Sequence, residues 1–387
     1  MQRFPYWRLS SFYFTYYMFV GAFVPYWGLY LKSVNFSAVE IGVLLSLFQV
    51  SRIFSPSFWG WLADRTNRRV VWIKLTALLG LLGYIGVFFG TSFVWLFFVM
   101  AALSIFTSST LPLAEAVTMA HIEPANQPYG RIRVWGSIGF IVAVLGLGLL
   151  LDFAEIESLL WCLLLIQATL FLLSFKIPEP YVPPHHTDHL PVWKIVTRPE
   201  VLSLLIGSCL MVSAHSVYYS FFSIFLEDRG YSKTLIGILW AVGVVCEILM
   251  FVVMPKLTAR FSLKQILLMS LMLAVLRFAM IGSGVSSLAI LLLAQTLHAA
   301  TFGSFHVASV AIVHQYFKGK HQAKGQAIYS SVGYGLGGTI GGISGGYALQ
   351  YLGGETTFML TAIYPLIGFL VVAYWLKNSH ANSHVRR

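Results

Sequence analysis

The sequence predicts an all-α membrane protein in which twelve transmembrane helices form two six-helix bundles. Three observations predict this fold. The chain of 387 residues is 58% hydrophobic and only 10% charged, apolar runs of spanning length follow one another along it, and its two halves resemble each other. A soluble domain carries about 25% charged residues, so the soluble classes of globular protein are excluded.

Twelve apolar runs are expected to form the helices, because a spanning helix needs about 20 predominantly apolar residues. Their predicted starts lie near Ser10, Ser37, Val70, Phe93, Arg133, Ser158, Val201, Thr234, Leu263, Ser286, Gly325 and Thr356. The segment before the first run lacks the pattern of a signal peptide with a cleavage site, so we expect that run to stay in the membrane.

Lysine and arginine are unevenly divided between two sets of loops. Of the 25 Lys and Arg residues, 20 fall in one set and only Lys32, Arg229 and Lys233 in the other, while Arg52 and Arg277 lie inside apolar runs. Loops on the cytoplasmic side carry the excess of positive charge. Both termini are therefore predicted to be cytoplasmic. The formal net charge of +11 is explained by this orientation in the membrane, so we expect no nucleic-acid partner.

The longest polar interruption divides the chain in two, and its prolines preclude a regular helix. It holds His185, His186 and His189. A solvated linker is favoured over a metal site there, because no Cys or repeated carboxylate completes a ligand set. The predicted parts are an N-terminal bundle over 1–176, a cytoplasmic linker over 177–199 and a C-terminal bundle over 200–387.

The two halves carry an internal repeat, which is typical of transporters. The segment NFSAVEIGVL at 35–44 aligns with GYSKTLIGIL at 230–239, at a shift of 195 residues. The same shift places the intramembrane Arg52 on Glu247. The acid that interrupts the apolar run around Glu247 therefore has a basic counterpart in the other half.

The loop after the second predicted helix reads GWLADRTNRR, from Gly60 to Arg69. It resembles the cytoplasmic loop signature of the major facilitator superfamily, with Asn67 at a position where glycine is usual. Asn also tolerates a left-handed turn, so the departure is mild. The resemblance implies the major facilitator fold, with a cytoplasmic gate at Gly60, Asp64, Arg65, Arg68 and Arg69. Asp64 would cap a helix end or pair with a basic residue there.

Further segments resemble the phenylpropionate permease type of this superfamily over nearly the whole chain. They are FTYYMFVGAFVPYWGLYLK, SRIFSP, YGRIRVWGSIGF, GVVCEILMF, LRFAMIG and LHAATFGSFH. Several also look like lactose permease, and both kinds of protein are proton-coupled uptake systems. The resemblance therefore implies a proton symporter of the bacterial inner membrane that acts as a monomer, without cofactor or metal.

The lactose permease pattern implies roles for individual residues. Glu115 and Arg133 take the places of a charged pair that holds substrate, and Phe140 takes the place of an aromatic residue that stacks on it. Glu247, Arg277 and His298 match the proton-coupling network. Two positions depart from that pattern: Thr301 stands where the permease has its main proton-carrying carboxylate, and Gln295 replaces a lysine.

Glu247 is our predicted proton carrier, since an ionisable residue at membrane depth is costly and usually functional. The alternative is a permanent ion pair with Arg277 or Arg52 that only holds helices together. His298 suits a coupling or a structural role equally, whereas His215 and His306 are expected to make interhelical hydrogen bonds.

Glycines and aromatic residues are expected to shape the helices. Gly333, Gly337, Gly341 and Gly345 recur every fourth residue, so one helix face is bare backbone that a neighbour can approach closely. Aromatic residues crowd the first and seventh helices, where some can line a pocket for a flat ring.

The predicted function is import of a small organic solute, with an aromatic carboxylate such as 3-phenylpropionate favoured. Arg52 and Arg133 would suit its carboxylate, while Glu115 beside Arg133 would equally suit a sugar or nucleoside, whose hydroxyls need donors and acceptors. An exporter of drugs or lipids is a further alternative. No catalytic motif of a hydrolase or metalloprotease is present, so no enzyme is predicted.

Overall fold

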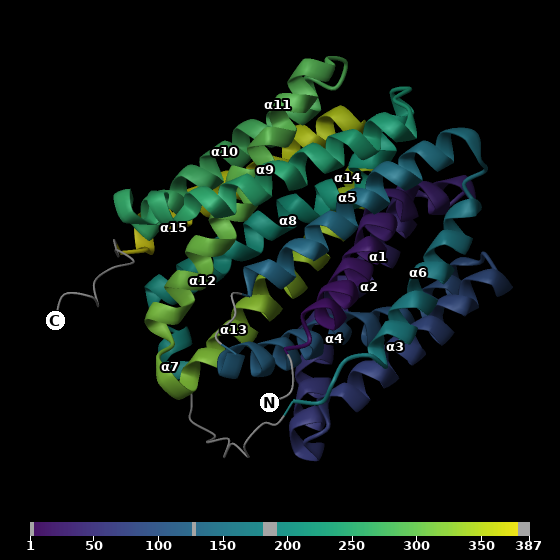
Figure 1. Cartoon of the computed structure of the whole chain (residues 1–387). Helices are drawn as coiled ribbons and strands as arrows, with labels where there is room; N and C mark the ends of the chain where they lie inside the picture. Colours follow the sequence, from purple (N-terminus) through teal and green to yellow (C-terminus); the bar gives the residue numbers. More distant parts are fainter. Residues whose placement is uncertain (1–3, 126–128, 181–191, 378–387) are drawn as a thin grey trace. The chain divides into compact units, whose positions relative to one another are not determined.

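The structure is a computed structural model that describes residues 4–125, 129–180 and 192–377. Throughout these residues the regular structure is helical and contains no strand, which confirms the predicted all-α fold (Figure 1). The first part of the chain holds α1 (Tyr6–Ser33), α2 (Ala38–Thr66), α3 (Arg69–Ile85), the 3₁₀ turn η1 (Gly86–Phe89), α4 (Phe93–Ala125), α5 (Gly130–Phe153) and α6 (Ser158–Ser174).

The second part is also helical, and two of its spans contain a π-helical segment. It holds α7 (Trp193–Val196), α8 (Pro199–Asp228), α9 (Lys233–Arg260), α10 (Leu263–Ser283), α11 (Leu288–His298), the π segment η2 (Ala299–Gly303), α12 (Ser304–Tyr316), the 3₁₀ turn η3 (Gly319–His321), α13 (Gln322–Ser330), the π segment η4 (Ser331–Gly337), α14 (Gly338–Thr361) and α15 (Ile363–Trp375). The helix starts agree with the predicted ones within about one turn.

Within the described residues, nine helical runs are long and apolar enough to cross a membrane. Three features account for the remaining spans. α6, Ser158–Ser174, is apolar but shorter, α1 has 28 residues and a more aromatic composition, and the last run of 54 residues, Gln322–Trp375, exceeds the roughly 20 that one span needs. That run breaks at Gly353, where φ is +78° and the backbone is not helical. The described helices thus provide twelve segments, as predicted.

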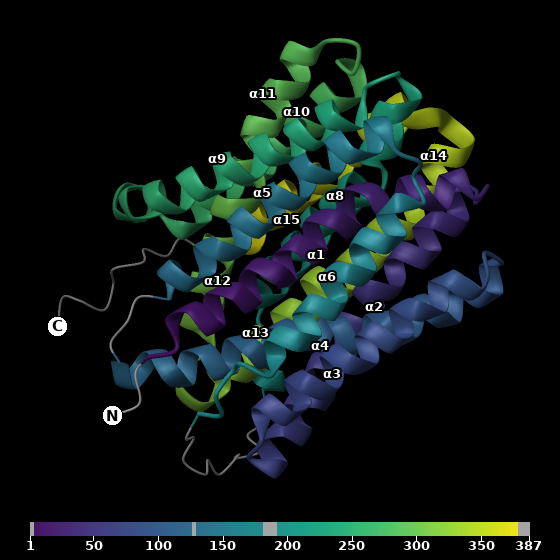
Figure 2. The ribbon, with the colours of Figure 1, turned by 45° about the vertical axis from the view of Figure 1, so that its right-hand side comes forward.

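The described residues form two compact units. The first holds α1–α6 together with residues 231–238, and the second holds α8, the rest of α9 and α10–α15. Within each unit the long helices lie side by side (Figures 1 and 2).

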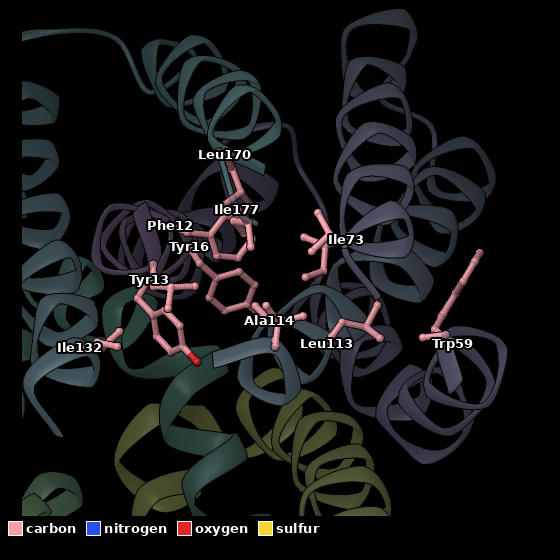
Figure 3. Packing of buried hydrophobic residues seen from close by; sticks show 14 of the residues in the cluster. Phe12, Tyr13, Tyr16, Trp59, Ile73, Leu113, Ala114, Ile132, Leu170 and Ile177 are labelled. Carbon is pink, nitrogen blue, oxygen red and sulfur yellow. The ribbon is translucent and has the colours of Figure 1, made fainter. Parts of the chain in front are cut away.

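All six helices of the first unit contribute to one apolar core. Figure 3 shows Phe12 and Tyr16 of α1 close to Leu170 of α6, with Ile73 of α3 facing them. The same core holds Trp59 of α2, together with Leu113 and Ala114 of α4 and Ile132 of α5. Side chains from all six helices therefore pack around the N-terminal half of α1.

The internal repeat is visible in local backbone geometry. Asn35 has φ +66° and Gly230 has φ +81°, and these two residues are related by the shift of 195 residues. The next residues repeat as well, because the Ser37 hydroxyl accepts from the backbone N–H of Glu40 and the Ser232 hydroxyl accepts from that of Leu235. A left-handed residue followed by a serine cap therefore starts the second helix of each half.

Glycines allow equivalent helix pairs to approach closely in both units. A methyl group at Gly139 of α5 would overlap the carbonyl oxygen of Phe14 of α1, and one at Gly337 of η4 would overlap that of Cys209 of α8. Phe14 and Cys209 are again 195 residues apart. A methyl group at Gly341 would likewise overlap the Ser213 carbonyl, so the predicted close packing along this glycine face is confirmed.

Hydroxyl pairs bridge a second set of equivalent helices. Thr110 of α4 donates to Thr76 of α3 at 3.2 Å, and Ser270 of α10 and Ser304 of α12 share a hydrogen bond of 2.8 Å. Both pairs join residues 34 positions apart. Where surrounding lipid offers no hydrophobic drive between helices, such contacts and close packing hold them together.

Candidate functional site

In the first unit, Arg133 of α5 stacks on an aromatic ring of α1. Its guanidinium carbon lies 4.1 Å from the centroid of the Tyr17 ring. Gly136, one turn further along α5, makes room for this contact, because a methyl group there would lie 2.6 Å from Tyr17 Cδ2 and 2.9 Å from Arg133 Nη1. The guanidinium therefore lies over the ring in a cation–π contact.

Glu115 of α4 belongs to the same cluster. Its Oε1 accepts a hydrogen bond of 3.2 Å from the hydroxyl of Tyr129, which precedes α5. Burial, and then the charge of Glu115, raise the pKa of Tyr129 to about 12, so this hydroxyl stays protonated and donates at neutral pH. The charges of Glu115 and Arg133 act on each other and on Tyr17. The structure thus brings together the predicted charged pair and adds Tyr17 and Tyr129 to it.

The other two residues of the predicted substrate group have different surroundings. Arg52 on α2 is exposed, and its charge reaches the Tyr16 hydroxyl along with those of Glu115 and Arg133. Phe140 is buried, with 9% of its surface exposed, and its backbone carbonyl lies where a methyl group on Gly21 of α1 would be. Phe140 therefore lies in the close α1–α5 interface.

The predicted gate loop is a tight turn between α2 and α3. Asp64 Oδ1 accepts a 2.9 Å hydrogen bond from Arg69 Nη2, and 60% of the Asp64 side chain is exposed. Asn67 has φ +51°, which confirms that it supplies the left-handed residue in place of glycine. Val70, at the start of α3, donates its backbone N–H to Glu179 Oε2 at 2.9 Å. Sequence reasoning missed this cap because Glu179 lies 109 positions away.

The remaining residues of the gate motif are on the surface of the first unit. Arg65 lies over the Trp61 ring, with its guanidinium carbon 5.4 Å from the centroid, and Arg68 is the residue that precedes α3. A methyl group on Gly60 would meet no atom within 4 Å. Packing inside this unit therefore does not require glycine at position 60.

In the second unit, Glu247 of α9 lies beside His298 of α11. The distance from Glu247 Oε2 to His298 Nε2 is 3.9 Å, and the two side chains are 19% and 7% exposed. Val245, Leu249 and Val252 form an exposed apolar face of α9. Glu247 faces away from it towards η2, because a methyl group on Gly303 would lie 3.3 Å from Glu247 Cγ.

Arg277 of α10 is completely buried, with 0% of its surface exposed. Its Nε donates to the Ala294 carbonyl at 2.9 Å, and its guanidinium carbon lies 4.3 Å from the centroid of the Tyr218 ring and 5.2 Å from that of Phe278. Neither Nη1 nor Nη2 makes a hydrogen bond to any residue that the structure describes. A hydrogen-bonded ion pair between Arg277 and Glu247 is therefore absent from the described geometry.

The other intramembrane histidines each make a predicted interhelical hydrogen bond. His215 of α8 shares one of 3.4 Å with the Thr301 hydroxyl of η2, besides a 2.9 Å hydrogen bond with the Met211 carbonyl within its own helix. His306 lies 2.9 Å from the Tyr334 hydroxyl, measured from Nδ1. His298 differs from both, since its Nδ1 has no hydrogen-bond partner among the described residues.

Tyr218 and Gln295 join the second cluster. The Tyr218 hydroxyl donates to Gln295 Oε1 at 2.7 Å, and the Tyr218 ring lies 5.9 Å from that of His298. The crowding of aromatic residues in the seventh predicted helix was the sequence signal for Tyr218. The position of Gln295 beside it follows only from the tertiary structure, since 77 residues separate the two along the chain.

No group of three or more possible metal ligands among His, Cys, Asp and Glu occurs in the described parts of the chain. The histidine cluster at His185, His186 and His189 lies outside the described residues.

Comparison with known proteins agrees with this fold. The family described as "MFS_1 like family" matches residues 6–360. A probable 3-phenylpropionic acid transporter of Escherichia coli (strain K12) is 30% identical over 347 residues, which are 88% of this chain and 90% of that protein. Maltose permease of Geobacillus stearothermophilus is 25% identical over 370 residues, 95% of this chain and 93% of the permease.

A solved structure of a mutant nucleoside transporter NupG superimposes with a TM-score of 0.88 at 18% identity, covering 96% of this chain and 100% of that one. At this identity the similarity establishes the fold alone. Together with the family match over nearly the whole length, this similarity in fold identifies the protein as a multi-pass membrane transporter and not as an enzyme. The chain belongs to the MFS_1 like family of the major facilitator superfamily.

Proposed function

We propose that the protein is a proton-coupled symporter that imports a small aromatic carboxylate such as 3-phenylpropionate. The observation that carries the substrate class is Arg133 held 4.1 Å above the Tyr17 ring. A guanidinium binds a carboxylate through two parallel hydrogen bonds, and the aromatic residues beside it offer faces for a flat ring. The similarity to a probable 3-phenylpropionic acid transporter supports the same class.

In this proposal the first unit binds substrate. Arg133 contacts the carboxylate, Arg52 adds positive charge near Tyr16, Glu115 positions Arg133, and Phe140 forms part of the aromatic wall. Asp64 and the basic residues that follow it act as the cytoplasmic gate. The protein works as a monomer in the bacterial inner membrane with both termini in the cytoplasm, as the distribution of Lys and Arg predicts.

Glu247 is the proposed proton carrier, and Arg277 and His298 adjust its proton affinity. Glu247 interrupts an apolar helix, faces away from the exposed side of α9 and lies 3.9 Å from His298. Burial favours the neutral acid and nearby positive charge favours the carboxylate. A rearrangement that changes the distance to Arg277 or His298 would therefore load or release the proton.

A sugar or nucleoside is the second candidate substrate. Glu115 supplies acceptor oxygens beside the donors of Arg133, and hydroxyl groups need both. The similarity to a maltose permease and to a nucleoside transporter is consistent with this alternative.

Uptake into proteoliposomes tests the proposed function. We expect labelled 3-phenylpropionate to accumulate when a proton gradient is imposed, and accumulation to stop when an uncoupler is added. Glu247→Gln should abolish accumulation yet retain exchange of labelled for unlabelled substrate, because the amide keeps the shape of the acid and carries no proton.

Glu155→Gln, at an exposed acid outside the helices, is the matched control and should accumulate substrate normally. Accumulation by the Glu247→Gln protein would exclude Glu247 as the carrier. If the unmodified protein took up a disaccharide or nucleoside and no aryl acid, the second candidate would replace the first.

A further inference from the structure

We infer that the second unit holds a carboxylate-binding subsite formed by Arg277 of α10 and Gln295 of α11. The inference rests on the proposed function and deepens it, because it gives the carboxylate of an aromatic acid a second place besides Arg133, in the second unit. Arg277 and Gln295 are both 0% exposed. Arg277 Nη1, Arg277 Nη2 and Gln295 Nε2 make no hydrogen bond to any described residue.

Neighbouring contacts orient both side chains and leave these nitrogen atoms unused. The Tyr218 hydroxyl donates to Gln295 Oε1 at 2.7 Å, so the amide oxygen is occupied and Nε2 is left as a donor. Arg277 Nε donates to the carbonyl of Ala294, the residue before Gln295, at 2.9 Å. The end of the Arg277 side chain is therefore anchored next to the amide that completes the donor set.

The unused nitrogen atoms are all hydrogen-bond donors, and this determines which chemical group can bind them. Guanidinium and amide nitrogens are donors only, and buried polar groups almost always have a partner. The complementary group is an acceptor with negative charge. A carboxylate fits best, because its two oxygens match the fork of a guanidinium and its remaining lone pairs can accept from an amide.

The surroundings favour a carboxylate attached to an aromatic ring. Arg277 lies over the Tyr218 ring at 4.3 Å, and Phe302 stacks on His298 with centroids 5.5 Å apart and an interplanar angle of 8°. The Tyr218 ring also lies 4.9 Å from Trp240. An aryl group that follows its carboxylate into this cluster meets flat faces, whereas a chloride ion would gain nothing from them.

The test measures binding of sodium 3-phenylpropionate to the purified full-length protein by titration calorimetry, with 3-phenylpropionamide and sodium chloride as comparison ligands. Gln295→Leu removes one donor and should weaken binding of the acid about tenfold or more, with little change for the amide, because a hydrogen bond to a charged group is the stronger kind.

Gln295→Glu is the sharper variant. It places a carboxylate beside Arg277 and should abolish binding of the acid while the melting temperature is retained or raised, since the new group supplies the missing acceptor. Gln167→Leu is the matched control, because Gln167 of α6 is 1% exposed with an unpartnered Nε2 and lies in the other unit. Its affinity for the acid should equal that of the unmodified protein.

Unchanged affinity for the acid in both Gln295 variants would overturn the inference. If sodium chloride bound the unmodified protein as tightly as sodium 3-phenylpropionate does, the assignment to a carboxylate would be overturned. These failures differ from failure of the proposed function, in which the unmodified protein neither binds nor transports the acid. Weaker binding by the Arg133→Lys protein together with unchanged affinity in both Gln295 variants would place the carboxylate in the first unit alone, and would overturn the inference while the aryl acid remains the substrate.

Discussion

At the scale of single residues, each unit places an arginine against a tyrosine of its first long helix. Arg133 lies 4.1 Å from the Tyr17 centroid and Arg277 lies 4.3 Å from the Tyr218 centroid. The two arginines are not related by the internal repeat, since they occur on α5 and α10. Their electrostatic surroundings also differ, because Arg133 lies within reach of Glu115 whereas the Arg277 Nη atoms have no hydrogen-bond partner in the described chain.

The role of Arg133 can be measured by substitution. If it binds an aryl carboxylate, Arg133→Lys should weaken binding by roughly 1.5 to 3 kcal/mol, the range for hydrogen bonds to charged groups, because lysine cannot form the bidentate contact. The loss should be far larger for the acid than for its amide. Binding titrations with both ligands check this expectation.

Glu115→Gln provides the comparison for Arg133→Lys. For a sugar or nucleoside both substitutions should be equally damaging, because both members of the pair would contact hydroxyl groups. For an aryl acid Glu115→Gln should be the milder change. Should the acid and its amide bind the unmodified protein equally well, the carboxylate interpretation is wrong.

At the scale of elements, glycines control how closely helices pack. Gly139 of α5 lies against the Phe14 carbonyl, whereas a methyl group on Gly146 of the same helix would meet no atom within 4 Å. We expect Gly139→Ala to destabilise the protein by about 1–3 kcal/mol, the cost of overpacking. Gly146→Ala should be neutral or slightly stabilising, because alanine favours the helix.

Thermal unfolding in detergent, followed by size-exclusion chromatography, compares these two variants. Gly337→Ala should behave like Gly139→Ala, since its close approach to the Cys209 carbonyl is the equivalent contact in the second unit. Equal melting temperatures for Gly139→Ala and Gly146→Ala would contradict the proposed importance of the close α1–α5 approach.

The turn between α2 and α3 carries a prediction about rate. The Asp64–Arg69 pair is largely exposed on the Asp64 side, and exposed ion pairs contribute only about 0–1 kcal/mol to stability. Asp64→Asn should therefore leave the melting temperature nearly unchanged. It should slow transport strongly with little change in substrate affinity, because it alters the balance between two states of the gate and not the binding site.

Initial rates of uptake over a range of substrate concentrations separate these effects. A raised KM with an unchanged maximal rate would argue against a gate role for Asp64. The charge-exchanged protein with Asp64→Arg and Arg69→Asp tests the ion pair itself. If its transport rate recovered to that of the unmodified protein, attraction between these two positions would be sufficient for gate function.

At the scale of the whole molecule, the distribution of Lys and Arg predicts the orientation. In a protein whose cysteines Cys162, Cys209 and Cys246 are replaced by serine, Arg68→Cys should react with a membrane-impermeant maleimide only after cells are permeabilised. Thr91→Cys, in the exposed loop before α4, should react in intact cells. The opposite pattern would reverse the predicted topology of both termini.

The sequence by itself determined the fold class, the order of the helices and the repeat. Hydrophobic runs report helix positions because the bilayer requires every backbone group to be paired within the helix. Local signals such as Asn35 and Gly230 repeat at 195 residues because the same turn starts the second helix in each half. The candidate charged residues Arg52, Glu247 and Arg277 also stood out, since charge inside an apolar run is rare, whereas the resemblance to lactose permease indicated Glu115 and Arg133.

Only the tertiary structure decided which of these residues meet, because contacts between helices depend on rotation about each helix axis and on side chains far apart in sequence. It placed Tyr17 under Arg133 and Glu247 beside His298, and it placed Phe140 in the α1–α5 interface. It also left Arg277 with two unpartnered nitrogens beside Gln295. No periodicity along one helix encodes such contacts, since each depends on how the backbones of two helices pack around glycine and aromatic residues.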